Sequence, residues 1–235
     1  MLETMSEADV PPVGLLETLA AGVAHEVRNP LNSLQINVGI LEQDLLDLEV
    51  EPDAHAFLVL RRIAGEIKRL DDFVSEFLRF ARLPQPRLER HSVRLLLADL
   101  AAFLKPEFSK KGVALDCESR GTEFVWIDRT HLEQAVLNLA LNALQATPLG
   151  GHVKVRSRAD ERRLVVTVED DGDGMTSEVR QMASTPFFTT RENGTGLGLA
   201  LVERVAREHG GSVEIASRPG GGTSVRLVFP QTKGA

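Results

Sequence analysis

A histidine followed by a glutamate, with an asparagine one helical turn further on, is the group of residues best suited to chemistry. These residues are His25, Glu26 and Asn29, in the stretch Ala24-His25-Glu26-Val27-Arg28-Asn29-Pro30-Leu31-Asn32. Imidazole has an ordinary pKa of about 6.5 and is an adequate nucleophile near neutral pH. The adjacent carboxylate can accept the proton of the second ring nitrogen or fix the tautomer. We interpret His25 as a nucleophile; the alternative is a surface histidine beside a surface charge.

The helical pattern around His25 predicts that it lies away from a buried seam. Apolar residues recur at steps of four and three, as in a coiled coil. They are Val23, Val27, Leu31, Leu34, Val38, Leu41, Leu45 and Leu48. At 100° per residue, His25 and Asn29 fall about 200° and 240° from Val23, opposite the seam. We therefore expect both side chains to face solvent, and Pro30 to kink the helix beside them.

A second helical seam follows, from Phe57 to Ala81, after the break at Glu51-Pro52-Asp53. Two antiparallel helices alone leave an apolar stripe exposed unless a second hairpin covers it. A homodimer that forms a four-helix bundle is therefore the expected arrangement. The alternative is a hairpin packed on the C-terminal domain of its own chain.

The chain divides into four predicted segments. They are a flexible leader over 1–12, the helical hairpin over 13–83, a linker over 84–90 and a second domain over 91–232. In the second domain, helices are expected over 93–108, 129–147 and 199–209. Strands are expected over 113–118, 124–127, 152–158, 163–169, 212–217 and 223–229, with a loop over 170–198. This interleaving without regular βαβ repeats predicts an α/β sandwich with a mixed sheet.

Composition excludes several classes of protein. The 43% hydrophobic content suits a packed core, and the net charge of −7 argues against nucleic-acid binding. The single cysteine, Cys117, rules out an intrachain disulfide framework and fits a reducing compartment. No apolar run approaches the roughly 20 residues of a membrane span, and the acidic N-terminus does not resemble a signal peptide. We therefore expect a cytoplasmic protein with no membrane span in this chain.

Asn138 and Asn142 lie one turn apart on the predicted helix 129–147 and share a face. Their amide oxygens can ligate Mg²⁺, although capping or packing amides would look the same in isolation.

The stretch Asp170-Asp171-Gly172-Asp173-Gly174-Met175 follows a predicted strand. Its glycines allow a flat ligand to approach closely, and Asp170 can accept a hydrogen bond from an exocyclic amine. A calcium loop is excluded, because its twelfth position would be Gln181 instead of glutamate.

A glycine-rich stretch, Gly194-Thr195-Gly196-Leu197-Gly198-Leu199, leads into the last predicted helix. Bare glycine backbone and free amides at a helix N-terminus form a cradle for phosphate. No Gly-Lys-Ser/Thr follows, so the stretch is not a P-loop, and its spacing does not match the dinucleotide fingerprint.

Together these stretches resemble two-component sensor histidine kinases. The stretch from Ala24 to Asn32 is similar to their H-box, in the form typical of the nitrogen-regulation branch. The other stretches resemble the N, G1 and G2 boxes, and Pro186-Phe187-Phe188-Thr189-Thr190 resembles the F box. The resemblance covers about residues 14–230 and implies a Bergerat-type ATP-binding fold.

The resemblance implies a role for each matching residue. His25 would be the phosphoacceptor, Glu26 its base, and Asn29 a residue that positions water for dephosphorylating the partner. Asp170 would bind the adenine amine, and Asn142, with Asn138 nearby, would hold Mg²⁺. The remaining implied ATP-binding residues are Gly172, Gly174, Phe187, Phe188, Thr190, Arg191, Gly194, Thr195, Gly196, Leu197 and Gly198. Phe187 and Phe188 would anchor an ATP lid over about 175–195.

We therefore expect an ATP-dependent protein-histidine kinase that phosphorylates His25 and then an aspartate of a response regulator receiver domain. ATP hydrolases of the same fold carry a glutamate where this chain has Asn138, and an amide cannot act as a general base. An ATPase of this fold and a nucleotide-binding scaffold remain the alternatives. The stimulus, the upstream sensor and the cognate regulator are unknown from the sequence.

Overall fold

The computed structural model describes residues 13–51, 55–191 and 194–231. For residues 13–23 and His25 it describes the backbone but not the side chains. The leader predicted over 1–12 lies outside the described residues. The chain forms two compact units that divide between Leu83 and Pro84. Strand β1 already begins at Glu89, inside the segment interpreted as a linker. No helix among the described residues has the length and apolar character that crossing a membrane requires.

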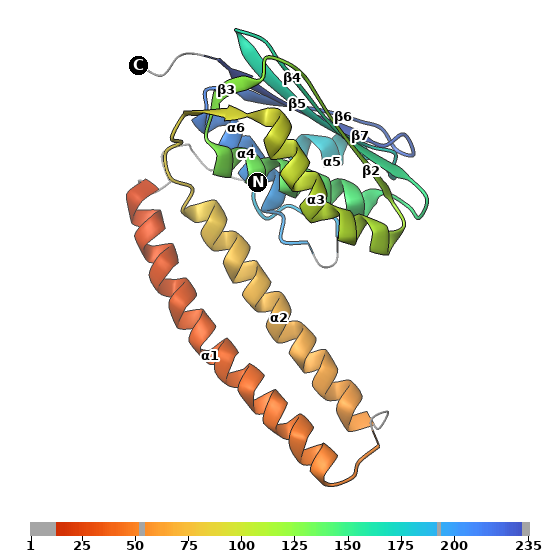
Figure 1. The fold of residues 1–235 in the computed structure, drawn as a ribbon. Helices are drawn as coiled ribbons and strands as arrows, with labels where there is room; N and C mark the ends of the chain where they lie inside the picture. Colours follow the sequence, from red (N-terminus) through yellow and green to blue (C-terminus); the bar gives the residue numbers. More distant parts are fainter. Residues whose placement is uncertain (1–12, 52–54, 192–193, 232–235) are drawn as a thin grey trace, which may run out of the picture. The chain divides into compact units, whose positions relative to one another are not determined.

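The first unit is a hairpin of two long antiparallel helices, as predicted (Figure 1). Helix α1 spans Val13–Asp47 and helix α2 spans His55–Ala81. Pro30 lies inside α1, which remains one continuous helix.

Only half of the predicted α1 seam is buried within the hairpin. Its core contains Leu31 and Val38 of α1 and Leu60 and Ile67 of α2, with Leu45 and Ala64 packed beside them. The other seam residues with described side chains are exposed by 36–74%: Val27, Leu34, Leu41 and Leu48. The prediction that all these residues form one buried seam is therefore wrong for a single copy of the chain. The residues within each set are seven apart, and the two sets are offset by three or four residues. The helix therefore carries a wide apolar face, and its partner helix covers one side of that face.

The second unit is an α/β sandwich with a mixed five-stranded sheet, as predicted. The strands are β2 Ala114–Gly121, β4 His152–Ala159, β5 Arg163–Asp170, β6 Ser212–Ser217 and β7 Thr223–Pro230. Their order is β2-β4-β5-β7-β6; β2 runs parallel to β4, and the other pairs are antiparallel. A separate antiparallel pair is formed by β1 Glu89–Ser92 and β3 Phe124–Ile127.

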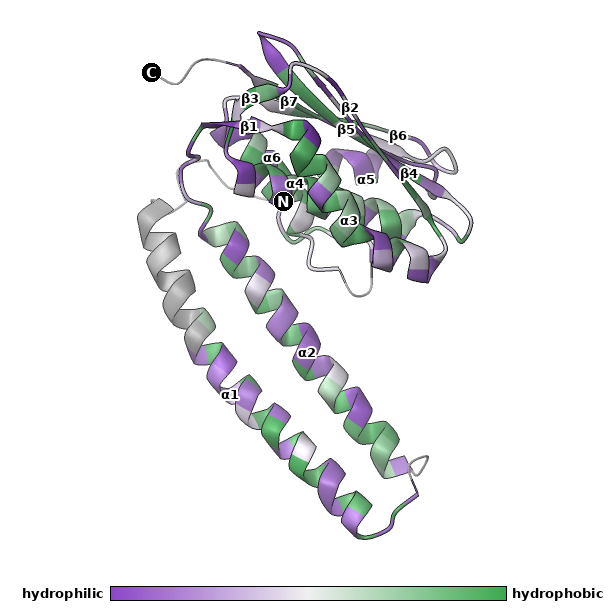
Figure 2. Cartoon of the chain, in the orientation of Figure 1, coloured by the Kyte–Doolittle hydropathy of each residue, from purple (hydrophilic) through white to green (hydrophobic). Residues whose placement is uncertain are grey.

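Helices cover one face of the sheet (Figure 1). They are α3 Val93–Lys111, α4 Arg129–Ala146 and α6 Gly198–Glu208. Alternation along the strands explains the layering, because β4 buries every second residue from Val153 to Ala159. Figure 2 shows the hydrophobic positions of the strands and helices that form this core. Each fully buried valine or leucine side chain contributes roughly 1.5–3 kcal/mol.

The segment 170–198 is not entirely a loop. A short helix, α5, spans Ser177–Met182, and the Thr176 side chain accepts a hydrogen bond from the amide of Val179 at its start. The loop prediction was wrong here, because Thr176 is an effective N-cap within a polar stretch that lacks apolar periodicity.

Two histidines are buried where α4 and α6 meet. His131 is 2% exposed, and its Nδ1 atom has no hydrogen-bond partner among the described residues. His209 Nδ1 lies 2.8 Å from the carbonyl oxygen of Val205, and its Nε2 faces the amide of Asp128 at 3.3 Å. These contacts assign the proton to Nδ1 of a neutral ring. Burial lowers the pKa of both histidines, and the Asp128 carboxylate counteracts this in part.

Acidification should therefore destabilise the second unit. Below an ordinary histidine pKa of about 6.5 the unfolded chain binds protons that the folded chain does not, so stability falls as pH decreases. We expect a loss on the order of 1 kcal/mol between about pH 7.5 and 5.5. His131→Leu should reduce this loss. The measurement is urea unfolding of the full chain, followed by the fluorescence of Trp126, the only tryptophan.

His55→Gln is the matched control, because His55 is exposed on α2 and should leave the pH dependence unchanged. An acid sensitivity of His131→Leu equal to that of the wild type would contradict the role given to this histidine.

Candidate functional site

The residues around His25 lie on α1 of the first unit. The side chains of Glu26 and Asn29 are exposed, whereas Ala24 and Leu31 are buried. This agrees with the predicted exposure of Asn29. The His25 side chain lies outside the described residues, so its orientation stays a prediction.

Arg28 ties the two helices together at this level. Its Nη2 atom donates to Ser75 Oγ at 2.7 Å, and its Nε atom lies 3.3 Å from a carboxylate oxygen of Asp71. Sequence reasoning did not find this pair of contacts, because Asp71 and Ser75 lie on the second helix. An exposed ion pair contributes little stability, so the effect of these contacts is mainly to fix the register of α1 against α2.

Asn138 and Asn142 lie beside the start of α6. Both are partly buried on α4. A methyl group on Gly198 would lie 3.5 Å from Asn142 Nδ2 and 3.6 Å from Asn138 Oδ1. The structure thus brings together two stretches that the sequence separates by more than fifty residues. Within the described residues no side chain caps α6, so the amides of its first turn can bind an anion.

Asp170 is held at the end of β5. Its Oδ1 atom accepts hydrogen bonds from the amides of Gly172 at 3.0 Å and Thr223 at 3.1 Å. Its Oδ2 atom has no hydrogen-bond partner in the part of the chain that the structure describes. Burial raises the pKa of Asp170, while the two amide hydrogen bonds lower it. The carboxylate is thus oriented with one oxygen available to a ligand donor; sequence reasoning missed Thr223, which comes from a different strand.

The glycines after Asp170 pack against the protein itself. A methyl group on Gly172 would lie 2.5 Å from the carbonyl oxygen of Ala146, at the end of α4. Gly174 has a φ of 67° and would collide with the carbonyl oxygen of Arg218 if it carried a side chain. These glycines were predicted to let a ligand approach the backbone. In the structure they instead let the loop pack closely between α4 and the turn before β7.

The stretch from Phe187 to Leu197 is anchored differently from the prediction. Phe187 is 54% exposed and Phe188 is partly buried, so the Phe187 side chain is not buried in this structure. Instead Leu197 is buried, at 1% exposure, and the Phe187 amide donates to the Gly196 carbonyl oxygen at 3.1 Å. Phe187 has a φ of 67°, which is unfavourable for a side chain of this size. Thr190 is exposed, and Thr195 Oγ1 accepts from the Leu197 amide.

Arg191 reaches back to α4. Its Nη1 atom donates to Asn142 Oδ1 at 3.0 Å and to Gln145 Oε1 at 2.6 Å. Its Nη2 atom donates to the backbone carbonyl oxygen of Asn142 at 3.0 Å. Arg191, the predicted phosphate contact, is therefore hydrogen-bonded to Asn142, a predicted Mg²⁺ ligand.

The surroundings of Asn142 show whether this residue suits a Mg²⁺ ion. The Asn142 amide oxygen accepts one hydrogen bond from the Arg191 guanidinium, so this oxygen already faces positive charge. No group of three His, Cys, Asp or Glu in the described ranges could hold a metal ion. Amide oxygens that share the metal with phosphate oxygens and water fit Mg²⁺, which is usually bound together with substrate phosphates.

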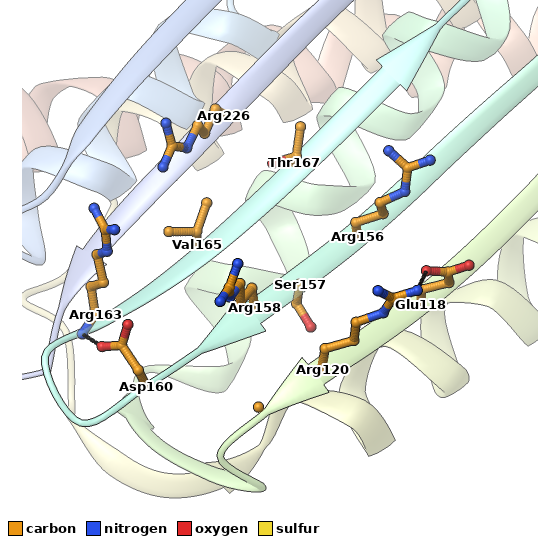
Figure 3. Close-up of a pocket in the computed structure, with 11 residues that line it drawn as sticks. Glu118, Arg120, Arg156, Ser157, Arg158, Asp160, Arg163, Val165, Thr167 and Arg226 are labelled. Atoms are coloured by element: carbon orange, nitrogen blue, oxygen red, sulfur yellow. Dashed lines mark hydrogen bonds and ion pairs between the residues drawn. The ribbon is translucent and has the colours of Figure 1, made fainter.

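Among the described residues, the surface of the second unit includes a larger and a smaller hollow. The larger, of about 1010 Å³, lies on the face of the sheet opposite the helices (Figure 3). Its arginines include Arg120, Arg156 and Arg226, which pair with glutamates at 3.2, 2.6 and 3.2 Å. Ion-paired side chains of this kind are common on a sheet face that is open to solvent. None of the predicted site residues lines this hollow. The smaller, of about 480 Å³, is lined by Asp170, Gly222 and Thr223, and it adjoins the site.

Comparison with known proteins agrees with this geometry. Residues 15–86 match the model of the His Kinase A (phospho-acceptor) domain. Residues 127–233 match that of the histidine kinase-, DNA gyrase B- and HSP90-like ATPase. Sporulation kinase D of Bacillus subtilis is 30% identical over 96% of this chain and 44% of its own length. The sensor histidine kinase ZraS of Escherichia coli is 32% identical over 90% of this chain and 45% of its own. The chain thus spans less than half the length of these curated relatives.

Solved structures are also similar. Full-length ShkA, crystallised with AMPPNP, superposes with a TM-score of 0.74 and 26% identity, over 93% of this chain and 47% of that one. The catalytic domain of histidine kinase ThkA gives a TM-score of 0.57 and 27% identity, over 62% of this chain and 97% of that one. A phosphoacceptor domain and an ATP-binding domain in this order identify the chain as a member of the two-component histidine kinases.

Proposed function

We propose that the chain is an ATP-dependent protein-histidine kinase that phosphorylates His25 and passes the phosphoryl group to an aspartate of a response regulator. The observation that carries the proposal is the position of Asn138 and Asn142 beside Gly198, at the uncapped start of α6. A helix N-terminus beside two amide oxygens suits a Mg²⁺-bound phosphate chain.

Each residue has a chemical task in this proposal. The free Oδ2 atom of Asp170 accepts a hydrogen bond from the adenine amine, and the glycines before α6 leave room for phosphates. Asn142 and Asn138 hold Mg²⁺, which neutralises phosphate charge when bound, while ATP supplies the γ-phosphoryl group. A ring nitrogen of His25 forms a bond to the γ-phosphorus as the bond to the ADP oxygen breaks. Glu26 accepts or orients the proton on the other ring nitrogen.

Asn138 supports transfer over hydrolysis. A carboxylate at this position could take a proton from water, whereas an amide cannot act as a general base. ATP bound here should therefore persist until His25 arrives. Sequence and chemistry both favour a kinase over an ATPase of the same fold.

We also propose regulator phosphatase activity. The Asn29 side chain is exposed one helical turn after His25. Its amide can donate to and accept from a water that attacks the phosphoaspartate of a docked receiver domain. The form His-Glu-Val-Arg-Asn-Pro-Leu favours the nitrogen-regulation branch.

The exposed apolar residues of the hairpin support a homodimer. Val27, Leu34, Leu41 and Leu48 of α1 continue the covered face, and Ile63 and Leu70 of α2 are exposed by 43% and 51%. Apolar stripes of this kind on both helices match the missing half of a four-helix bundle. The dimer, an upstream sensor and a cytoplasmic location, where ATP is available, complete the proposal.

The first prediction concerns His25. Incubation with γ-labelled ATP and Mg²⁺ should give acid-labile label on the wild type and none on His25→Gln, because only the imidazole can form the bond to phosphorus. His55→Gln is the control and should be labelled normally. Label that persists on His25→Gln would refute the assigned nucleophile, and rapid ATP turnover with no phosphoprotein would favour the ATPase.

The second prediction concerns Asn29. Asn29→Ala should retain autophosphorylation but lose dephosphorylation of the phosphorylated regulator, because the amide that positions water is gone. Loss of phosphate from the regulator is measured with and without the kinase. Asn37→Ala, at another exposed asparagine of α1, is the control. Unchanged dephosphorylation by Asn29→Ala would disprove the phosphatase role.

The third prediction concerns the dimer. The double substitution Leu34→Asp and Leu41→Asp should shift the chain to monomer, because each leucine contributes roughly 1.5–3 kcal/mol when buried. The dissociation constant should rise by a factor of about 100 or more. Analytical ultracentrifugation measures this change, and circular dichroism checks that the helices persist. Asn32→Asp, on the opposite face of α1, should remain dimeric; a dimeric double variant would rule out this interface.

A further inference from the structure

The side chain of Gln145 is a part of the site that the proposed reaction does not use. Gln145 lies on α4 three residues after Asn142, so the two side chains share a helix face. Its Oε1 atom accepts a hydrogen bond from Arg191 Nη1 at 2.6 Å, the shortest of the three that the guanidinium donates. Among the described residues, the Gln145 side chain makes no other hydrogen bond.

The backbone of Arg191 is held separately from its side chain. Its amide donates to Thr189 Oγ1 at 3.1 Å, and its carbonyl oxygen accepts from the Gly194 amide at 3.2 Å. This local turn does not involve α4. The three bonds of the guanidinium can therefore be broken by rotation of one side chain, without unfolding the turn.

The position of the guanidinium conflicts with a metal on Asn142. Arg191 Nη1 lies 3.0 Å from Asn142 Oδ1, the oxygen assigned to Mg²⁺. Mg²⁺ binds oxygen at about 2.0–2.1 Å and requires nearly octahedral geometry. A guanidinium and a divalent cation on one amide oxygen would repel each other and crowd the coordination sphere. Arg191 in this position and Mg²⁺ on Asn142 therefore exclude each other.

We propose that Gln145 is a positioning residue that holds Arg191 on Asn142, so that Mg²⁺ and nucleotide must displace the guanidinium before Asn142 can ligate the metal. This inference rests on the function proposed for the site. Once displaced, the Arg191 guanidinium is available to pair with phosphate oxygens of the nucleotide. Gln145 thus sets the free-energy difference between Arg191 held on α4 and Arg191 available to nucleotide, and with it the rate and affinity of Mg²⁺-nucleotide binding.

Two substitutions of Gln145 should act in opposite directions. Gln145→Ala removes an acceptor from a charged donor, so Mg²⁺-ADP should bind about tenfold more tightly, mainly through faster association. Gln145→Glu replaces the amide by a carboxylate that pairs with Arg191, so binding should slow and weaken. The measurement is stopped-flow binding of a fluorescent ADP analogue to the full chain in excess Mg²⁺.

Two further arms separate this mechanism from other roles of Gln145. The tighter binding of Gln145→Ala should shrink when Mg²⁺ is replaced by EDTA, because the competition is for a metal ligand. It should also disappear in the Arg191→Ala background, since Gln145 then has nothing to hold. In the ligand-free chain, the Arg191 Nη signals in ¹⁵N NMR should show slowed rotation, and Gln145→Ala should make this rotation faster.

The outcomes distinguish this inference from the proposed function. Weaker binding of Gln145→Ala, with or without Arg191, would show a direct nucleotide contact and overturn the inference. Unchanged binding, together with unchanged Arg191 signals, would also overturn it, and the kinase proposal would stand. A wild-type chain that binds no Mg²⁺-ADP would instead contradict the proposed function itself.

Discussion

The packing of α4 on the sheet is the contact on which the candidate site depends. Leu132, Val136 and Leu139 of this helix are 0–3% exposed. Their burial fixes the rotation of the helix, and at 100° per residue this decides where every other side chain points. Asn138 and Asn142 consequently lie at the margin of the core, beside Gly198, and Gln145 lies one turn beyond. Burial of the apolar side chains thus determines the positions of the polar side chains. The polar side chains contribute little to the packing of the helix on the sheet.

At this margin several polar groups serve more than one purpose. The Asp170 carboxylate joins β5 to β7 through one oxygen and leaves the other for a ligand donor. The Asn142 amide accepts from Arg191 with the oxygen that suits a metal. Such shared groups make the site sensitive to the order of binding events, because one partner must leave before another binds. Burial also raises the pKa of Asp170, so its carboxylate becomes protonated at a higher pH than an ordinary carboxylate.

The helical hairpin is governed by a different constraint. A helix pair has too little interior to bury the wide apolar faces that these sequences carry, so the pair covers Leu31 and Val38 but leaves Leu34 and Leu41 exposed. The remaining apolar surface is the one assigned to the proposed homodimer. The Arg28 contacts to Asp71 and Ser75 set the register at the level of His25. In the proposed dimer, assembly and the position of His25 are therefore linked through the same two helices.

The sequence by itself determined the two long helices, the mixed sheet and nearly all element positions, because periodicity and turn residues are local signals. From residue types and spacing it also predicted His25, Asn138, Asn142 and Asp170 as candidate site residues. Only the tertiary structure decided which half of the α1 seam is buried and that Thr223 orients Asp170. It alone also decided that Leu197, instead of Phe187, anchors its segment and that Arg191 bonds Asn142 and Gln145. These features depend on contacts between residues far apart in the chain, and neither spacing nor composition encodes which distant partner a side chain meets.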